Sequence, residues 1–327
     1  MMRRLLAAVL LVLAAALPVA LSSVSWPAQA APAVADAAHF DYRLAAREVG
    51  PGVYVIEGAN ADFSLGNGCN IINTGFIVTG AGVIVVNTGP TKRYGEQQRA
   101  LIARTTKEPV IRVVHLDLHP DYFLGNQAYA DVPRAATPAT RAGMAREGAA
   151  YEDNLYRLCG DWMLGTARLL PDTDAVPGVE RIGSHEIELR ELRGHTASDL
   201  VLIDRGSGVA FVGGLVFSRR IPTTPHAEMA NWLASLQTLE GWNLHFLVPS
   251  HGDVVEGVAA IAGTRRYLRW LDQAFSAAAA RGLEMNEVLR LPVPAEFRTW
   301  GAFDTEYIRN VAHLYPRYEQ TVLQHGR

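Results

Sequence analysis

The sequence predicts an α/β protein in which short strands alternate with helices along most of the chain. Runs of β-branched and aromatic residues, separated by Gly and Asn, indicate strands over 53–56, 75–79 and 83–86. A helix expected over 91–105 then leads to the apolar run at 110–114. Strand and helix alternation of this kind is typical of sheets that are covered by helices.

A second set of strands and helices follows, so the predicted layout is a doubled arrangement of sheet and helix. Residues 186–192 alternate apolar with charged side chains, as a half-buried strand does. Runs at 200–203 and 209–212 are joined by Asp-Arg-Gly-Ser-Gly, a composition typical of a hairpin turn. The remaining expected elements are helices over 139–158, 229–239, 260–280, 285–289 and 305–323, and a strand over 245–248.

The first thirty residues have the order of parts of a secretory signal peptide. Residues 1–4 are positively charged, 5–21 are apolar, and 28–30 form a small-residue cleavage signal. The apolar run is short for a membrane span. We therefore expect cleavage after Ala30, a periplasmic or secreted protein, and no membrane span in the mature chain.

Charge and cysteine content restrict the classes of partner and site. The net charge of −3, with both signs interspersed, argues against a nucleic-acid surface. Cys69 and Cys159 lie about 90 residues apart, and in an oxidising compartment a disulfide between them would stabilise the fold by about 4 kcal/mol. Two unpaired buried thiols are the alternative, and two distant cysteines do not make a zinc ribbon.

The polar segment 115–126 is the strongest functional signal in the chain. It follows the apolar run at 110–114 and begins with alternating His115, Asp117, His119 and Asp121. Neutral imidazole and carboxylate are both good zinc ligands, and alternate side chains at a strand end point to the same side. The segment therefore predicts a metal site.

Three further polar turns stand where expected strands end. They are Gly-His-Thr at 194–196, Gly-Gly-Leu at 213–215 and Pro-Ser-His-Gly at 249–252. With segment 115–126, their order resembles the metallo-β-lactamase superfamily signature of His-x-His-x-Asp-His, Gly-His-Thr, Gly-Asp and Gly/Ser-His-Gly. Val-Val-Asn-Thr-Gly at 85–89 stands where that family has an Asp-Thr-Gly turn.

The residues around these turns resemble the sequences of one periplasmic branch of the superfamily, the quinoprotein relay system zinc metallohydrolases. The similar stretches are 119–126, 158–162, 195–199 and 307–318. The resemblance implies an αββα sandwich with a helical C-terminal extension and a site at one edge of the paired sheets. The implied organisation is a signal peptide at 1–30, a flexible lead-in at 31–50, a metallo-β-lactamase-fold domain at 51–258, and a helical part at 259–327 packed on that domain.

Four residues match metal-ligand positions of the family, and four other positions depart from it. The matches are His119, Asp121, His195 and His251. The departures are Asp117 for the first histidine, Tyr122 for the histidine after Asp121, Gly214 for the aspartate that bridges two metals, and Asn87 for the turn aspartate.

The departures predict one metal ion rather than two. Asp117, His119 and His195 supply three ligands, the usual number at an open catalytic zinc site, and iron is an alternative metal. Asp121 and His251 remain for a second site that lacks its bridge, and we expect Tyr122 to pack over it rather than bind metal. His115 shares the strand-end side of Asp117 and is an alternative ligand.

The resemblance implies a hydrolase that attacks an ester, thioester or amide carbonyl of a small-molecule substrate. A carboxylate ligand at Asp117 cancels one unit of metal charge, so bound water is acidified less than at a three-histidine site. Asp121 would act as general base, and Asp121 and His251 would position the nucleophile or leaving group. The alternative is a non-hydrolytic accessory protein of a periplasmic quinoprotein dehydrogenase or c-type cytochrome.

The remaining histidines have no partner at ligand spacing and receive no role. They are His39, His185, His226, His245, His313 and His325. Arg219 and Arg220 follow the turn at 213–215 and could hold an anionic substrate, although exposed loop arginines are the simpler interpretation.

Overall fold

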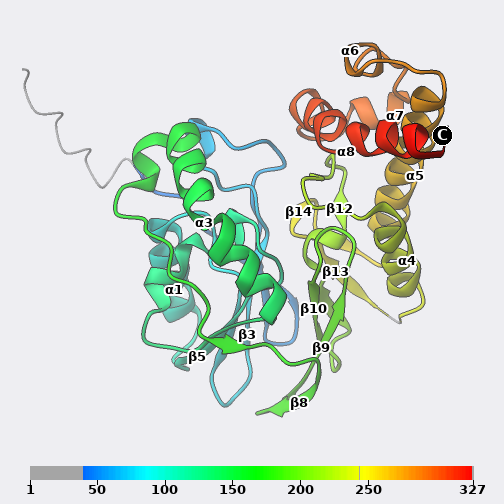
Figure 1. Ribbon diagram of the computed structural model, residues 1–327. Coiled ribbons are helices and arrows are strands. Elements are labelled where there is room, and N and C mark those ends of the chain that lie inside the picture. The colour runs from blue at the N-terminus through cyan, green and yellow to red at the C-terminus, as the bar shows by residue number, and fades with distance from the viewer. Residues whose placement is uncertain (1–39, 243, 326–327) are drawn as a thin grey trace, which may run out of the picture. The chain divides into compact units, whose positions relative to one another are not determined.

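The computed structural model describes residues 40–242 and 244–325, which belong to one compact unit (Figure 1). The expected signal peptide and most of the expected lead-in lie outside the described residues. None of the described helices combines the length and the apolar character that crossing a membrane requires.

The first described sheet has seven strands in chain order, β1 to β7. The strands β1 to β4 pair antiparallel, and β4 to β7 pair parallel. Their bounds are β1 Ala46–Gly50, β2 Val53–Ile56, β3 Thr74–Val78, β4 Val83–Val86, β5 Val110–Val114, β6 Arg134–Ala136 and β7 Thr173–Asp174. Because β4 is buried along its whole length, it reads as a continuous apolar run.

The second described sheet has six strands in the order β15-β13-β11-β10-β9-β8. The expected hairpin is present, since β10 and β11 pair antiparallel across the turn at 204–209. The bounds are β8 Gly178–Ile182, β9 His185–Leu192, β10 Asp199–Asp204, β11 Val209–Phe211, β13 Phe246–Val248 and β15 Val255–Glu256. A separate parallel pair joins β12 (Phe217–Ser218) to β14 (His251–Gly252).

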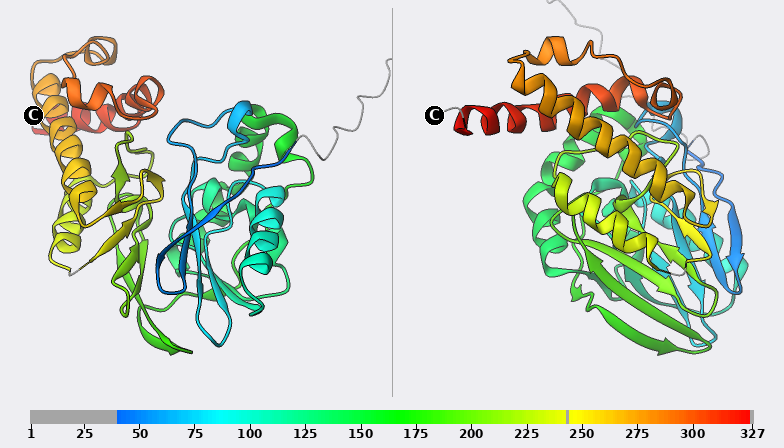
Figure 2. Two further views of the ribbon diagram at one scale, coloured as in Figure 1. Left: turned by 180° about the vertical axis from the view of Figure 1, so that it is seen from behind. Right: turned by 90° about the vertical axis from the view of Figure 1, so that its right-hand side faces the viewer.

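The two sheets pack face to face, and helices cover both outer faces (Figures 1 and 2). Apolar residues of both sheets share one buried cluster, to which β10 contributes Leu200 and Leu202. The alternate residues of β10, Val201 and Ile203, pack against Trp232 of α4 in another cluster. This alternation is the period-two pattern of a strand buried on both faces. The structure thus confirms the expected αββα sandwich.

The helices that flank the first sheet are α1 (Lys92–Thr105) and α3 (Pro138–Cys159). Thr91 caps α1 by accepting from the backbone N–H of Tyr94, and Thr137 caps α3 in the same way. Short helical turns lie between them and after α3, namely α2 Pro120–Phe123, η3 Leu124–Tyr129 and η4 Gly160–Met163.

The C-terminal part is helical and shares its apolar core with the second sheet. Tyr267 and Leu271 of α5, and Val311 and Leu314 of α8, are buried in the cluster that also contains Val201 of β10. The helices are α4 Met229–Glu240, α5 Ala259–Ala280, α6 Met285–Val288, α7 Ala295–Arg298 and α8 Phe303–His325. The predicted helical C-terminal extension is confirmed.

The structure differs from the sequence-based expectation at short strands. Residues 46–50, expected within a flexible lead-in, form β1 and pair with β2 from Ala46 opposite Ile56 to Gly50 opposite Val53. β1 is an edge strand with two exposed side chains, so backbone pairing and not an apolar pattern orders it. Strands of two to five residues such as β6, β7 and β8 are too short to show a reliable period.

Cys69 and Cys159 form a disulfide, with their Cα atoms 5.9 Å apart. The bond joins the loop after the short helical turn η2 (Leu65–Asn67) to the last residue of α3. Both cysteines are fully buried in an apolar cluster with Phe123 and Leu155. The disulfide therefore holds together two chain segments that both contribute to the cavity described below.

Candidate metal centre

The chain segment after β5 carries the first two residues of the site. Asn87, which follows β4 with a φ of +59°, accepts a hydrogen bond from the backbone N–H of Leu116 through Oδ1 at 3.1 Å. This contact fixes the backbone directly before Asp117. Although Asn87 departs from the family's aspartate, its amide oxygen accepts this hydrogen bond and so positions the segment that carries Asp117.

The loop between β9 and β10 brings His195 to the same place. The backbone N–H of His195 donates to Asp199 Oδ2 at 3.0 Å, and the Thr196 hydroxyl donates to Asp199 Oδ1 at 2.9 Å. Asp199 is the first residue of β10, so the sheet itself holds the His195 loop in its conformation.

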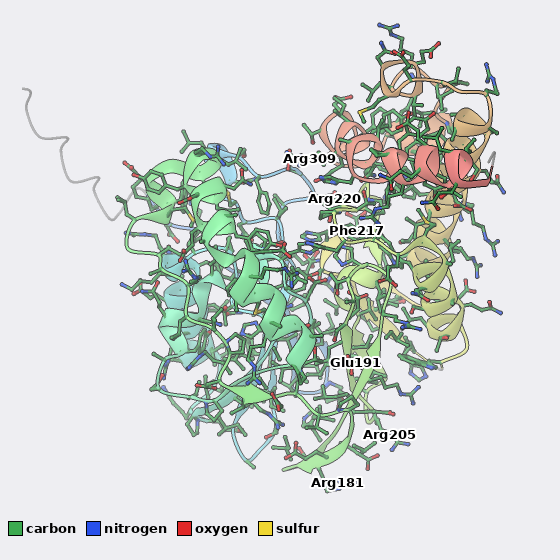
Figure 3. All side chains as sticks on the ribbon, in the orientation of Figure 1. Arg181, Glu191, Arg205, Phe217, Arg220 and Arg309 are labelled. Atoms are coloured by element: carbon green, nitrogen blue, oxygen red, sulfur yellow. A yellow bond between two sulfur atoms is a disulfide. The ribbon has the colours of Figure 1, made fainter. Side chains whose placement is uncertain are left out.

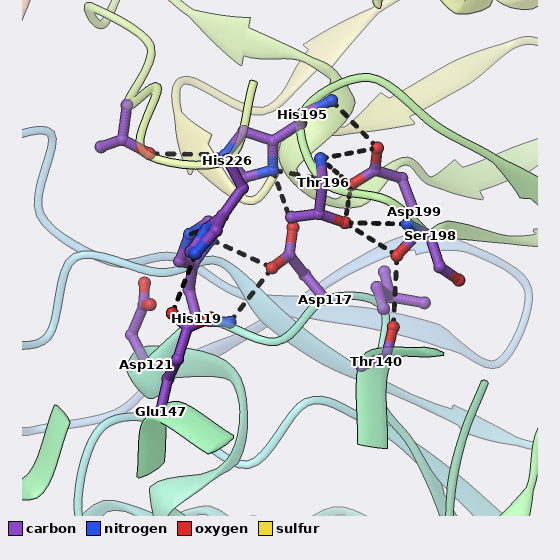
Figure 4. Close-up of polar contacts among 12 residues, drawn as sticks. Asp117, His119, Asp121, Thr140, Glu147, His195, Thr196, Ser198, Asp199 and His226 are labelled. Atoms are coloured by element: carbon purple, nitrogen blue, oxygen red, sulfur yellow. Dashed lines mark hydrogen bonds and ion pairs between the residues drawn. The ribbon is translucent and has the colours of Figure 1, made fainter. Parts of the chain in front are cut away.

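Asp117, His119 and His195 form a compact cluster in which each residue offers one ligand atom, and these atoms lie within 4.8 Å of one another (Figure 4). Asp117 Oδ2 is 2.7 Å from Nδ1 of His195, and Asp117 Oδ1 is 3.0 Å from Nδ1 of His119. One carboxylate thus contacts both imidazoles. The side chains of Asp117 and His195 are almost completely buried, and that of His119 is 11% exposed.

Charge pairing dominates the protonation of this cluster. Burial opposes ionisation of Asp117, but His119 and His195 hold the pKa of its carboxyl well below the usual range. Burial likewise disfavours the charged imidazole of His195, yet the neighbouring Asp117 and Asp199 carboxylates raise its pKa to about 10. A buried carboxylate that attracts positive charge this strongly is suited to hold a cation.

Asp121 and His251 form a second, smaller group beside the first. His251 Nδ1 donates to the carbonyl of Ile71 at 3.0 Å, and its Nε2 lies 3.4 Å from Asp121 Oδ2. Asp121 Oδ2 is buried and has no hydrogen-bond partner within the described chain. Burial raises the pKa of Asp121 to about 6, while burial and the charge of Arg220 hold the pKa of His251 well below its ordinary value.

Two of the departures from the family pattern have a clear structural consequence here. Tyr122 is fully buried in the cluster between the sheets, and its ring meets that of His251 edge-on at 6.3 Å. A Cβ atom on Gly214 would lie 2.0 Å from His195 Nδ1 and 2.9 Å from Asp117 Oδ2. Any side chain at position 214 would therefore push apart the Asp117 and His195 pair.

The donor chemistry of the first group fits one metal ion. Two imidazoles and one carboxylate are the ligand types of a three-ligand catalytic zinc site with an open position. Within the described ranges, this is the one group of three or more His, Cys, Asp or Glu side chains close enough to share an ion. Asp121 and His251 are near each other, but among the described residues no third ligand joins them.

His115, Arg219 and Arg220, which are also candidates from the sequence, lie outside the Asp117 cluster. His115 is fully buried and donates through Nδ1 to the carbonyl of Tyr122 at 3.1 Å, outside the Asp117 cluster. Burial lowers its pKa to about 4. Arg220, interpreted as an exposed loop residue, is fully buried near the Phe217 ring and lies 3.7 Å from Glu306 (Figure 3). Arg219 is exposed.

His226, to which the sequence assigned no role, contacts the cluster. Its Nδ1 lies 3.2 Å from His119 Nε2, and its Nε2 lies 2.9 Å from Glu147 Oε2 (Figure 4). His226 comes from the loop before α4 and is 107 residues from His119, so no spacing rule connects the two. Proximity of this kind arises only when the loop and α3 are placed against the site.

A cavity of about 370 Å³ opens beside His119 and Asp121. Its walls come from the loop before β3, from α3 and from the C-terminal helix α8. The apolar and aromatic lining residues are Phe63, Ile71, Pro120, Tyr151, Leu158 and Pro225, and the polar ones are Asn154, Thr223, Glu306, Arg309 and His313. Such a volume suits a small molecule.

Arg309 of α8 forms ion pairs at the edge of this cavity (Figure 3). Its guanidinium donates to Asp62 Oδ1 and to Glu306 Oε1, each at 2.9 Å. Asp62 stands directly before Phe63, so this ion pair joins the C-terminal helix to the loop that the disulfide holds from the other side. A different cavity, of about 520 Å³, lies between the sheets near β8 and contains none of the candidate ligands.

The αββα sandwich thus carries a buried cluster of histidine and aspartate at the ends of its strands. The family model described as the metallo-beta-lactamase superfamily matches residues 67–251. The chain belongs to this superfamily. No curated protein matches the sequence.

Several solved structures share the fold. A metallo-beta-lactamase from Pontibacter korlensis superposes with a TM-score of 0.57 at 20% identity, over 69% of this chain and 99% of its own. The metallo-beta-lactamase IND-7 gives 0.56 at 18% identity, over 69% and 98% of the two chains. TMB-1 gives 0.53 at 16% identity, over 70% and 98%. At these identities the likeness concerns the fold, and the fold hosts many chemistries.

Proposed function

We propose that the protein is a hydrolase with a single metal ion, which activates water for attack on an ester, thioester or amide carbonyl. The observation that carries the proposal is the convergence of Asp117, His119 and His195 beside a cavity of small-molecule size. Zinc is the metal that this donor set suits best, and iron is the alternative.

When bound, the metal would polarise the substrate carbonyl and make water nucleophilic at neutral pH. Asp117 would hold it through the carboxylate, and His119 and His195 through ring nitrogens. Asp121 lines the cavity, and its unpartnered Oδ2 can accept a proton from an attacking water. His251 donates Nδ1–H to the Ile71 carbonyl and presents Nε2, an acceptor while the ring is neutral, to Asp121, so it could share the proton that Asp121 takes from the water.

The cavity lining supports a substrate with an apolar portion. Phe63, Ile71 and Leu158 surround the space next to His119, whereas Arg309 is already paired with Asp62 and Glu306. An ester or thioester with an apolar group is therefore a better match than a compound of high negative charge. β-Lactam hydrolysis does not follow from the fold.

We also propose export to the periplasm or the medium. The charge and apolar pattern of residues 1–30 supports this proposal, and a disulfide is typical of an oxidising compartment. The resemblance of stretches such as 119–126 to the quinoprotein relay branch makes a periplasmic quinoprotein or c-type cytochrome the partner to test first.

Metal analysis of the mature protein, purified without chelators, tests the proposed function. The expected result is about one equivalent of zinc or iron in the wild type, none in His119→Ala, and an unchanged value in the exposed-residue control His245→Ala. A wild type without metal contradicts the proposal. Two equivalents contradict the single-ion site. A panel of ester and thioester substrates then tests whether turnover depends on the same residue.

A further inference from the structure

His226 and Glu147 extend the Asp117 cluster toward the protein surface. The contacts run from Asp117 Oδ1 to His119 Nδ1 at 3.0 Å, from His119 Nε2 to His226 Nδ1 at 3.2 Å, and from His226 Nε2 to Glu147 Oε2 at 2.9 Å (Figure 4). Two imidazoles thus stand in line between two carboxylates. The side chains of His226 and Glu147 are 25% and 22% exposed.

Glu147 is itself held in place. The Tyr151 hydroxyl, one turn further along α3, donates to Oε2 of Glu147 at 2.7 Å, and Arg146 donates to Oε1. Although partial burial opposes it, these donors lower the pKa of Glu147, so the group is a carboxylate at neutral pH. A carboxylate anchored in this way presents one fixed acceptor to His226.

The acceptor at Glu147 sets the direction of the hydrogen bonds. An ionised carboxylate only accepts, so His226 carries its proton on Nε2 and leaves Nδ1 as an acceptor. His119 must then donate to His226 through Nε2–H. The nitrogen of His119 that remains free to bind a cation is Nδ1, which is the one facing Asp117.

The number of ring N–H donors also points to His119 Nδ1 as the nitrogen that is free to bind a cation. Each of the three close contacts needs one hydrogen-bond donor, but two neutral imidazoles supply only two N–H donors. The contact left without a donor is that between Asp117 Oδ1 and His119 Nδ1. A cation held by Asp117 and His119 would take the place of the missing donor.

We propose that Glu147 and His226 are positioning residues for the metal centre, which hold the His119 ring in the tautomer and orientation that bind metal. This inference rests on the proposed function. Metal-binding histidines commonly donate their other ring N–H to a carboxylate. Here a second imidazole stands between the two and relays the orientation from α3 to the ligand.

Zinc affinity, measured by competition with a chromophoric chelator, tests the positioning role. His226→Phe and Glu147→Ala should each weaken zinc binding by about 10- to 100-fold, and Glu147→Gln by less because its amide oxygen still accepts. The matched control is Glu152→Gln, on the same helix and paired with Arg168 away from the site. Affinity unchanged in both Glu147→Ala and His226→Phe would overturn the proposal.

A second readout does not depend on bound metal. In the wild type, the imidazole Nε2–H proton of His119 should give a slowly exchanging NMR resonance, because it is hydrogen bonded to His226. His226→Phe should abolish that protection, and Glu147→Gln should shift the resonance even if the Phe variant folds poorly. A wild type that binds no metal but shows this pattern refutes the proposed function and leaves the positioning role intact. An unprotected His119 Nε2–H in the wild type refutes the positioning role itself.

Discussion

The Asp117 cluster and the Asp121–His251 pair lie side by side but differ in completeness. In the cluster, one carboxylate contacts two imidazoles at 2.7 and 3.0 Å, and a further histidine and a carboxylate support it from outside. In the pair, a contact of 3.4 Å joins His251 Nε2 to Asp121 Oδ2, and this oxygen accepts no hydrogen bond from the residues that the structure describes. A carboxylate shared by two imidazoles therefore distinguishes the candidate metal site from the pair of polar residues.

The missing third ligand explains why the two groups have different roles. At position 214 a side chain would meet His195 and Asp117 at once, so the compact cluster and a bridging residue exclude each other in this arrangement. Tyr122 packs in the buried core between the sheets, with its ring against that of His251. Asp121 consequently lines the cavity with His251 in contact with it, and to these two residues we assign proton transfer and positioning in the proposed function.

Removing the shared carboxylate should have the largest effect. In Asp117→Ala, metal binding should weaken by more than the roughly 10- to 100-fold typical of losing an outer hydrogen-bond partner, and turnover should disappear. His195 would also lose the carboxylate that stabilises its charged form. Metal content and chelator competition measure this; a variant that keeps its metal would show that the cluster is not the binding site.

Asp121→Asn should separate the two regions by abolishing proton transfer while metal stays bound. We expect kcat to fall by about 100- to 10,000-fold, the contribution of a general base. Because Asp121 acts only when ionised, the wild-type rate should fall as pH drops through a pKa at or below about 6, since a bound cation favours the carboxylate. Stoichiometric metal with low kcat is the expected combination, and loss of metal would assign Asp121 to the ligands.

Gly214→Ala tests whether space at the cluster requires glycine. The added Cβ would lie 2.0 Å from His195 Nδ1, so we expect a loss of about 1–3 kcal/mol in the free energy of unfolding and weaker metal binding. The control is Gly206→Ala in the β10–β11 turn, where the nearest atom is 4.0 Å away. Equal denaturation midpoints for the two variants would contradict this explanation.

Tyr122→Phe should have the smallest effect. The hydroxyl is buried without a hydrogen-bond partner among the described residues, and the ring packs in the core. Because a buried donor without a partner is unfavourable, removing the hydroxyl should not lower the free energy of unfolding and should leave metal content unchanged. A clear loss of metal in this variant would make Tyr122 a ligand and the Asp121–His251 pair a genuine second site.

Continuous β-branched runs predicted their strands well, and several short strands without such a run were missed. The strands at 53–56, 83–86 and 110–114 have the expected bounds, because each is a compact β-branched run. β1 and β12 were missed, since pairing with neighbouring strands orders them and their own composition carries little signal. The disulfide was one of two open alternatives until the fold brought both Cα atoms to 5.9 Å.

The sequence by itself determined the fold class, because strand and helix periods are local, and it determined the candidate ligands, because they stand at strand ends. Tertiary structure alone decided how those ligands group. It placed Asp117 between two imidazoles, left Asp121 with His251, and brought His226 and Glu147 to His119 across 107 and 28 residues of chain. Hydrogen bonds between distant segments depend on packing in three dimensions, and no spacing along the chain records them.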